Sequence, residues 1–118
     1  MDLKNYILRF QEHTDGEDSL YRHVEWTSNY DCPVKDLKPG ETVPFKPDKS
    51  MSEPSIHCVR ITDTEIELSY AGYSGHLESG IHTYKVVLSE QNPYWYTSNY
   101  GGRYDTDNRL MLIKPEKA

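Results

Sequence analysis

Alternation of polar and apolar residues is the dominant pattern in this chain, and a helical repeat is nearly absent. In residues 5–12 (NYILRFQE), the apolar side chains of Tyr6, Leu8 and Phe10 recur at every second position. Successive side chains of a β-strand point to opposite faces of its sheet, so this spacing predicts a strand with one buried face.

A second alternating segment follows at residues 20–27, with Leu20, Val24 and Trp26 on its apolar side. The sequence between the two segments, HTDGEDS at 13–19, is rich in turn formers. Its Asp-Gly pair tolerates the positive φ of a tight hairpin turn. The first quarter of the chain therefore predicts a β-hairpin that turns within 13–19.

The second half of the chain repeats this design. Residues 65–70 place Ile66, Leu68 and Tyr70 on one face and polar residues on the other, which is typical of a strand with one wet face. Further strands are predicted at 55–61, at 81–88 with Tyr84, Val86 and Leu88 on the core side, at 94–99 and at 109–114. The glycine-bearing segments 71–80 and 100–108 are predicted to be loops.

Residues 31–54 interrupt this rhythm, since they hold five of the seven prolines. Proline cannot donate a hydrogen bond to a ladder, so we expect a long loop with at most an edge strand at 42–45. A single helical turn at 34–37 is the only helix expected there.

About seven short strands separated by turns predict an all-β, mostly β fold. The expected architecture is a single-domain antiparallel β-sandwich or a small β-barrel spanning residues 1–118, with a short charged tail at 115–118. The pattern fits both closures and does not fix the strand order.

Charge narrows the range of partners. With 19 acidic and 13 basic residues, the net charge is −6, which repels nucleic-acid backbones and suits a basic protein partner. No apolar stretch approaches the ~20 residues of a membrane span, and the N-terminus lacks the pattern of a secretory leader. We therefore expect a cytoplasmic protein with no membrane partner, in which Cys32 and Cys58 are free thiols; a bridge between them would be expected only after export.

Catalytic and metal-binding motifs are missing from the sequence, which has no GxSxG, Walker, CxxC or HExxH pattern. Five histidines are present, and alternation places His57 with Val59 and Ile61, and His82 with Tyr84, at the rim of the core. We accordingly expect no catalytic residue, no metal and no cofactor.

Residues 93–108 (PYWYTSNYGGRYDTDN) form the densest candidate site, because rigid aromatics, an arginine and small polar residues are typical of recognition surfaces. The predicted partner-binding residues are Tyr94, Trp95, Tyr96, Tyr100, Arg103 and Tyr104, with Tyr73 and Glu78 at the rim. The first hypothesis is a small protein-binding inhibitor, antagonist or immunity protein. A carbohydrate-binding module using the same aromatics is the second, and a ligand-binding or enzymatic barrel with His57 or His82 inside is the third.

The tetrapeptide TSNY occurs twice, at 27–30 and at 97–100. The match does not extend into the flanking residues, whereas structural repeats usually agree over 20–50 residues. We interpret the two copies as strand ends that carry similar turn-forming residues, and not as a duplicated site. Two such ends at the same edge of the fold would still bring Trp26, Tyr30, Trp95, Tyr96 and Tyr100 onto one aromatic surface.

Overall fold

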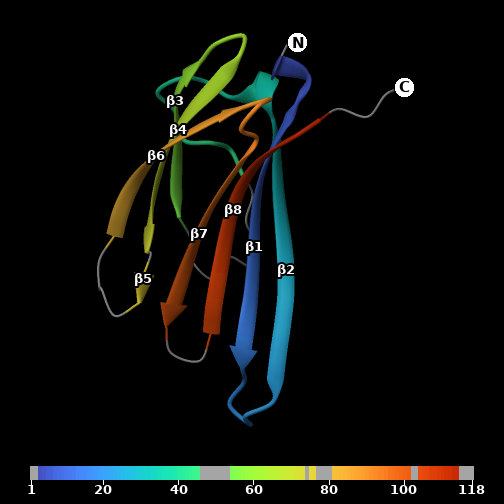
Figure 1. Ribbon diagram of the computed structural model, residues 1–118, viewed down its shortest axis with the longest axis vertical. Helices are drawn as coiled ribbons and strands as arrows, with labels where there is room; N and C mark the ends of the chain where they lie inside the picture. Colours follow the sequence, from blue (N-terminus) through green and yellow to red (C-terminus); the bar gives the residue numbers. More distant parts are fainter. Residues whose placement is uncertain (1–2, 46–53, 74, 77–80, 102–103, 115–118) are drawn as a thin grey trace.

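Eight strands and two short 3-10 turns make up the computed structural model, which describes residues 3–45, 54–73, 75–76, 81–101 and 104–114 (Figure 1). The predicted all-β fold is confirmed. In chain order the elements are η1 (Leu3–Asn5), β1 (Ile7–Glu17), β2 (His23–Pro33), η2 (Val34–Asp36), β3 (Ser55–Ile61), β4 (Glu65–Tyr73), β5 (Gly75–His76), β6 (Ile81–Ser89), β7 (Tyr94–Gly101) and β8 (Tyr104–Ile113).

The strands form two separate sheets. One contains five strands in the order β2-β1-β8-β7-β5, and the other contains three in the order β3-β4-β6. All neighbours are antiparallel except the two-residue β5, which runs parallel to β7. Of the two predicted closures the barrel is wrong, because no strand of one sheet pairs with a strand of the other within the described ranges.

One hydrophobic core joins the two sheets. The five-stranded sheet contributes Leu8, Phe10 and Leu110, all at most 2% exposed, and the three-stranded sheet contributes Leu68 and Leu88, both fully buried. The alternation predicted for 5–12, 65–70 and 81–88 is therefore confirmed, since each apolar face points inward. Burial of such side chains stabilises a fold by about 1.5–3 kcal/mol each.

The first hairpin turns later than predicted. β1 continues to Glu17, and Gly16 pairs with Val24 inside the ladder. The carboxylate of Asp18 accepts hydrogen bonds from the backbone N–H groups of Leu20 and Arg22, at 2.8 and 3.0 Å, which fixes the turn at 18–22. Leu20 consequently lies in the turn and is 66% exposed, so its predicted place in the core was wrong.

The two predicted glycine loops are shorter than expected. β4 extends to Tyr73, and β5 occupies part of the segment 71–80. β7 and β8 remain paired as far as Gly101 and Tyr104, so only two residues connect them and most of the predicted loop 100–108 is strand. Continuous backbone pairing on both sides of each connection outweighs the local preference of glycine for loops.

The proline-rich segment behaves largely as expected where it is described. β2 takes its first three residues, and the helical turn predicted at 34–37 is present as η2. The expected edge strand at 42–45 is reduced to a single bridge between Thr42 and His57. Residues 46–53 and the tail 115–118 lie outside the described residues.

Candidate functional site

The outer face of the five-stranded sheet, which points away from the three-stranded sheet, carries the most extensive set of interacting polar side chains. Cross-strand register brings Gln11 of β1, Arg109 of β8 and Tyr96 of β7 into one row. We use the term outer face for Arg9, Gln11, His13, Asp15, Glu17, His23, Glu25, Thr27, Asn29, Asp31, Tyr94, Tyr96, Asp105, Asp107, Arg109 and Met111.

Two exposed tyrosines on β7 flank an arginine on β8. Tyr94 and Tyr96 are 46% and 45% exposed. The Nε of Arg109 donates to the Tyr94 hydroxyl at 3.0 Å, and its guanidinium carbon lies 5.6 Å from the centre of the Tyr96 ring. The Tyr96 hydroxyl in turn donates to Asp107 at 3.2 Å. These contacts fix the orientation of both rings.

The same network continues across the sheet to its edge. Arg109 Nη1 donates to Gln11 Oε1 at 3.4 Å, and Gln11 Nε2 donates to Asn29 Oδ1 at 2.9 Å. Beside this row, Arg9 makes a two-pronged contact with Asp31 at 2.8 and 2.9 Å, and this bond raises the pKa of Arg9. Polar contacts thus connect β7, β8, β1 and β2, the four long strands of this sheet.

Negative charge predominates on the outer face. Six carboxylates stand against two arginines, counting the described positions of the three strands β1, β2 and β8 (Asp15, Glu17, Glu25, Asp31, Asp105 and Asp107 against Arg9 and Arg109). His13 lies 2.7 Å from Glu25 and 3.9 Å from Asp107, and His23 lies 3.3 Å from Asp15. Such a surface attracts cationic groups.

The predicted site residues are divided between the two sides of the sheet. Tyr94 and Tyr96 lie on the outer face. Trp95 points the other way and packs against Tyr70 and Tyr84, with ring centres 4.8 and 5.5 Å away. Tyr104 also lies on the inner side, edge-to-face with Trp26 at 5.9 Å. Tyr73 pairs with Ile81, and Tyr100 with Asp105, through their backbones, but their side chains are outside the description, as are Arg103 and Glu78 altogether.

A buried polar cluster on the inner face was missed by the sequence reasoning. Glu12, Thr14 and Asn108 are fully buried. The Asn108 Nδ2 donates to the Tyr70 hydroxyl at 2.7 Å, and the hydroxyls of Thr14 and Thr106 are 3.5 Å apart. Burial is the main reason that the pKa of Tyr70 is raised. Continuing the alternation of Leu8 and Phe10 for two more steps would have placed Glu12 and Thr14 on the core side.

The two TSNY copies present opposite faces of one sheet. Thr27 stands on the outer face in the middle of β2, whereas Thr97 pairs with Asn108 and stands on the inner face of β7. Tyr30 of the first copy is 7% exposed. The copies are therefore not equivalent units, and the first is not a strand end as predicted. Trp26, Tyr30 and Trp95 lie on the inner face and Tyr96 lies on the outer face, so these four residues do not form one surface.

The two described histidines of the three-stranded sheet are exposed, whereas both cysteines are buried. Ile56 and Cys58 face the core, so His57 between them faces away from it, and its predicted place at the rim of the core was wrong. A bulge at Cys58–Arg60 then shifts the register of Val59 and Ile61 against β4. His57 and His82 are both exposed. Cys32 and Cys58 are buried free thiols, and burial raises the pKa of both, which disfavours the reactive thiolate.

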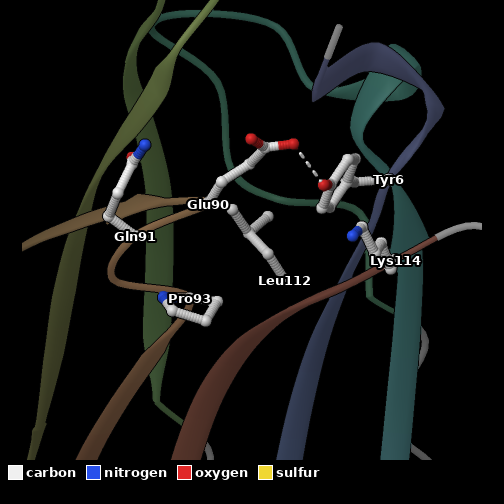
Figure 2. Close-up of a pocket in the computed structure, with 6 residues that line it drawn as sticks. All are labelled: Tyr6, Glu90, Gln91, Pro93, Leu112 and Lys114. Carbon is white, nitrogen blue, oxygen red and sulfur yellow. Dashed lines mark hydrogen bonds between the residues drawn. The ribbon is translucent and has the colours of Figure 1, made fainter. Parts of the chain in front are cut away.

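A surface cleft of about 460 Å³ lies at the end of the molecule near the N-terminus (Figure 2). It is lined by Tyr6, Glu90, Gln91, Pro93, Leu112 and Lys114. The hydroxyl of Tyr6 donates to Glu90 at 2.6 Å, and this bond to a carboxylate is the main cause that raises the pKa of Tyr6 to about 12. This hydrogen bond connects the turn after β6 to Tyr6, the residue that precedes β1.

Fold and surface together define a small protein of two antiparallel sheets with an acidic, tyrosine-bearing outer face. No family model, no curated protein and no solved structure matches the chain. Over the described ranges, no group of three or more His, Cys, Asp or Glu side chains is placed to hold a metal ion. The helical segments described are too short to cross a membrane.

Proposed function

We propose that this protein is a small cytoplasmic, non-catalytic binding protein that blocks a basic partner protein through its outer face, as an inhibitor, antagonist or immunity protein does. The main support is the Tyr94–Arg109–Tyr96 cluster, in which two exposed rings are held by one arginine. Tyrosine and arginine are enriched among the residues that dominate binding energy. Side chains that are already fixed lose less entropy when a partner docks.

Electrostatics supports a basic partner. The cluster adjoins Asp107, and the other carboxylates of the outer face extend from it toward β2. Complementary charge steers diffusional encounter and raises association rates from a neutral ~10⁵–10⁶ to as much as ~10⁸–10⁹ M⁻¹ s⁻¹ at low salt. Capture is therefore expected to be fast at low ionic strength and to slow as salt is added.

The placements of two side chains, Arg109 and Trp95, favour protein binding over the carbohydrate alternative. A sugar stacks on the open face of an aromatic ring, but the Arg109 guanidinium lies against the ring of Tyr96. Trp95, the largest ring of the predicted site, is directed into the contact between the sheets. These two placements leave Tyr94 and Tyr96 better suited to contact a protein surface.

The test is affinity capture from a lysate of the source cell at low and high salt. The wild type is compared with the double variant Tyr94→Ser/Tyr96→Ser. Val59→Ser serves as the matched control, because Val59 is 47% exposed on the other sheet. We expect one stoichiometric basic protein that is retained by the wild type and by Val59→Ser, and lost by the double variant and at high salt. Equal retention by all three proteins, or retention by none, would overturn the proposal.

A further inference from the structure

The strand β2 forms one open edge of the five-stranded sheet. It is 11 residues long and pairs only with β1 among the described residues (Figure 1, right-hand strand). The edge of β3 is not open in this way, because the segment before β3 bonds to its backbone. Gly40 N donates to Cys58 O at 2.7 Å, and Val43 N donates to Ile56 O at 2.8 Å. Open strand edges can accept a further strand.

Two hydrogen bonds show which backbone groups of β2 face this edge. Asp18 N donates to Arg22 O at one end of the hairpin, and Val34 N donates to Tyr6 O at the other. Both join even-numbered residues, and the register between them is continuous. Backbone groups alternate in direction along an antiparallel strand. The N–H and C=O groups of the odd-numbered residues of β2, from His23 to Asp31, are therefore directed to the open edge.

The side chains along β2 define what a neighbouring strand would need. On the outer face, Glu25 and Asp31 have side chains 51% and 38% exposed. On the inner face, Val24 and Trp26 are only partly buried. Since residues opposite each other on paired strands share a face, an added strand would place two of its outer-face side chains beside Glu25 and Asp31, and inner-face side chains beside Val24 and Trp26.

We propose that the basic partner inserts an extended segment that pairs with β2 as a sixth strand. This inference rests on the proposed function. Lysine or arginine side chains on the outer face of the added strand lie beside Glu25 and Asp31, and apolar side chains on its inner face lie beside Val24 and Trp26. Main-chain hydrogen bonds supply affinity in such strand addition, and the alternate side chains supply specificity.

Two alternatives, the edge strand β6 of the three-stranded sheet and a second copy of the chain, fit less well. β6 belongs to the three-stranded sheet, and its outward residue Lys85, 71% exposed in its side chain, would repel a basic segment. A second copy paired through β2 would bring two acidic outer faces side by side. Like charges placed together across an interface disfavour association.

The experiment uses amide hydrogen exchange with a defined probe, a peptide of alternating lysine and valine that matches β2 in length. A peptide of the same composition with its lysines and valines in separate blocks is the control. With the alternating peptide, we expect exchange of the Glu25, Thr27 and Asn29 amides to slow at least about tenfold. The Val24 and Trp26 amides already bond to β1 and should not change. Protection by both peptides, or by neither, would overturn strand addition.

A variant separates strand addition from docking on the outer face. Thr27→Pro removes one donor directed at the open edge, where proline is tolerated in a strand. Thr27→Val keeps that donor and is the matched control. Loss of peptide and partner binding by Thr27→Pro alone supports the inference. A partner that is retained by Thr27→Pro but lost by Tyr94→Ser/Tyr96→Ser refutes strand addition and leaves the proposed function intact. If the Glu25, Thr27 and Asn29 amides become protected without peptide as the protein concentration rises, the edge of β2 pairs with a second copy of the chain. That result would also refute strand addition by the partner.

Discussion

Removal of one buried hydroxyl, by the substitution Tyr70→Phe, is expected to destabilise the fold measurably. Tyr70 is fully buried on β4, and its hydroxyl accepts the 2.7 Å hydrogen bond from Asn108 of β8. The bond therefore connects the two sheets directly. Phenylalanine retains the ring and its contacts with Trp95 and Tyr84, so the substitution tests the hydrogen bond and not the packing.

The size of the effect follows from burial. A hydrogen bond contributes about 0.5–1.5 kcal/mol net, but removing one partner from a buried pair costs about 1–3 kcal/mol because the other partner stays desolvated. Asn108 is 0% exposed, so the larger range applies. With a urea m-value of about 2 kcal/mol/M, the unfolding midpoint should fall by about 0.5–1.5 M.

The assay is equilibrium unfolding in urea with Tyr96→Phe as the matched control. That substitution also deletes a tyrosine hydroxyl bonded to another side chain, at 3.2 Å from Asp107, but on a residue that is 45% exposed. Its cost should stay below about 0.5 kcal/mol, as is usual for surface changes. If Tyr70→Phe is no more destabilising than Tyr96→Phe at an unchanged m-value, the Tyr70–Asn108 bond does not stabilise the fold as argued.

Two further outcomes are expected. Tyr21 has a φ of 60° in the turn of the first hairpin, a conformation that is strained for any residue with a Cβ. Tyr21→Gly should therefore raise the free energy of unfolding by about 0.5–1 kcal/mol in the same urea assay. An unchanged or lower free energy would show that Tyr21 is not strained. The pKa of Tyr6 is raised to about 12 by its bond to Glu90, against about 10 in an unfolded chain, so its contribution to stability is complete below about pH 10 and declines as the pH rises toward 12. Unfolding midpoints measured across this window should fall less in Tyr6→Phe than in the wild type; equal slopes would show that Tyr6 is not the group responsible.

The sequence predicts the fold wherever alternation continues without a break. Residues 7–12, 65–70 and 81–88 lie on the strands and faces expected, because each predicted segment contains three apolar residues at a strict period of two. The boundaries were missed where glycine and turn formers lie inside paired strands, as at Gly16 and Gly101. Local preference is weak there, and the ladder with the neighbouring strand decides the conformation.

The candidate site was only partly predictable, because strand order determines which side chains meet. β7 was expected to carry the site, and Tyr94 and Tyr96 do lie exposed there. Their contacts with Arg109 depend on β8 lying beside β7, and the link from Arg109 to Gln11 depends on β1 lying on the other side of β8. Gln11 lies 98 residues away from Arg109 in sequence, a pairing that no local pattern reveals.

The distribution of polar contacts makes it possible to separate recognition from stability in this protein. The core lies around Leu8, Phe10 and Leu110, and sheet-to-sheet packing there dominates folding. Outer-face contacts are exposed, and such pairs typically contribute only about 0.2–1 kcal/mol each. Substitution of Tyr94 and Tyr96 should therefore leave the sheet intact while removing the two most exposed aromatic side chains of the outer face. A binding defect in the double variant would then report on the interface itself, whereas a defect in Tyr70→Phe would report on the fold.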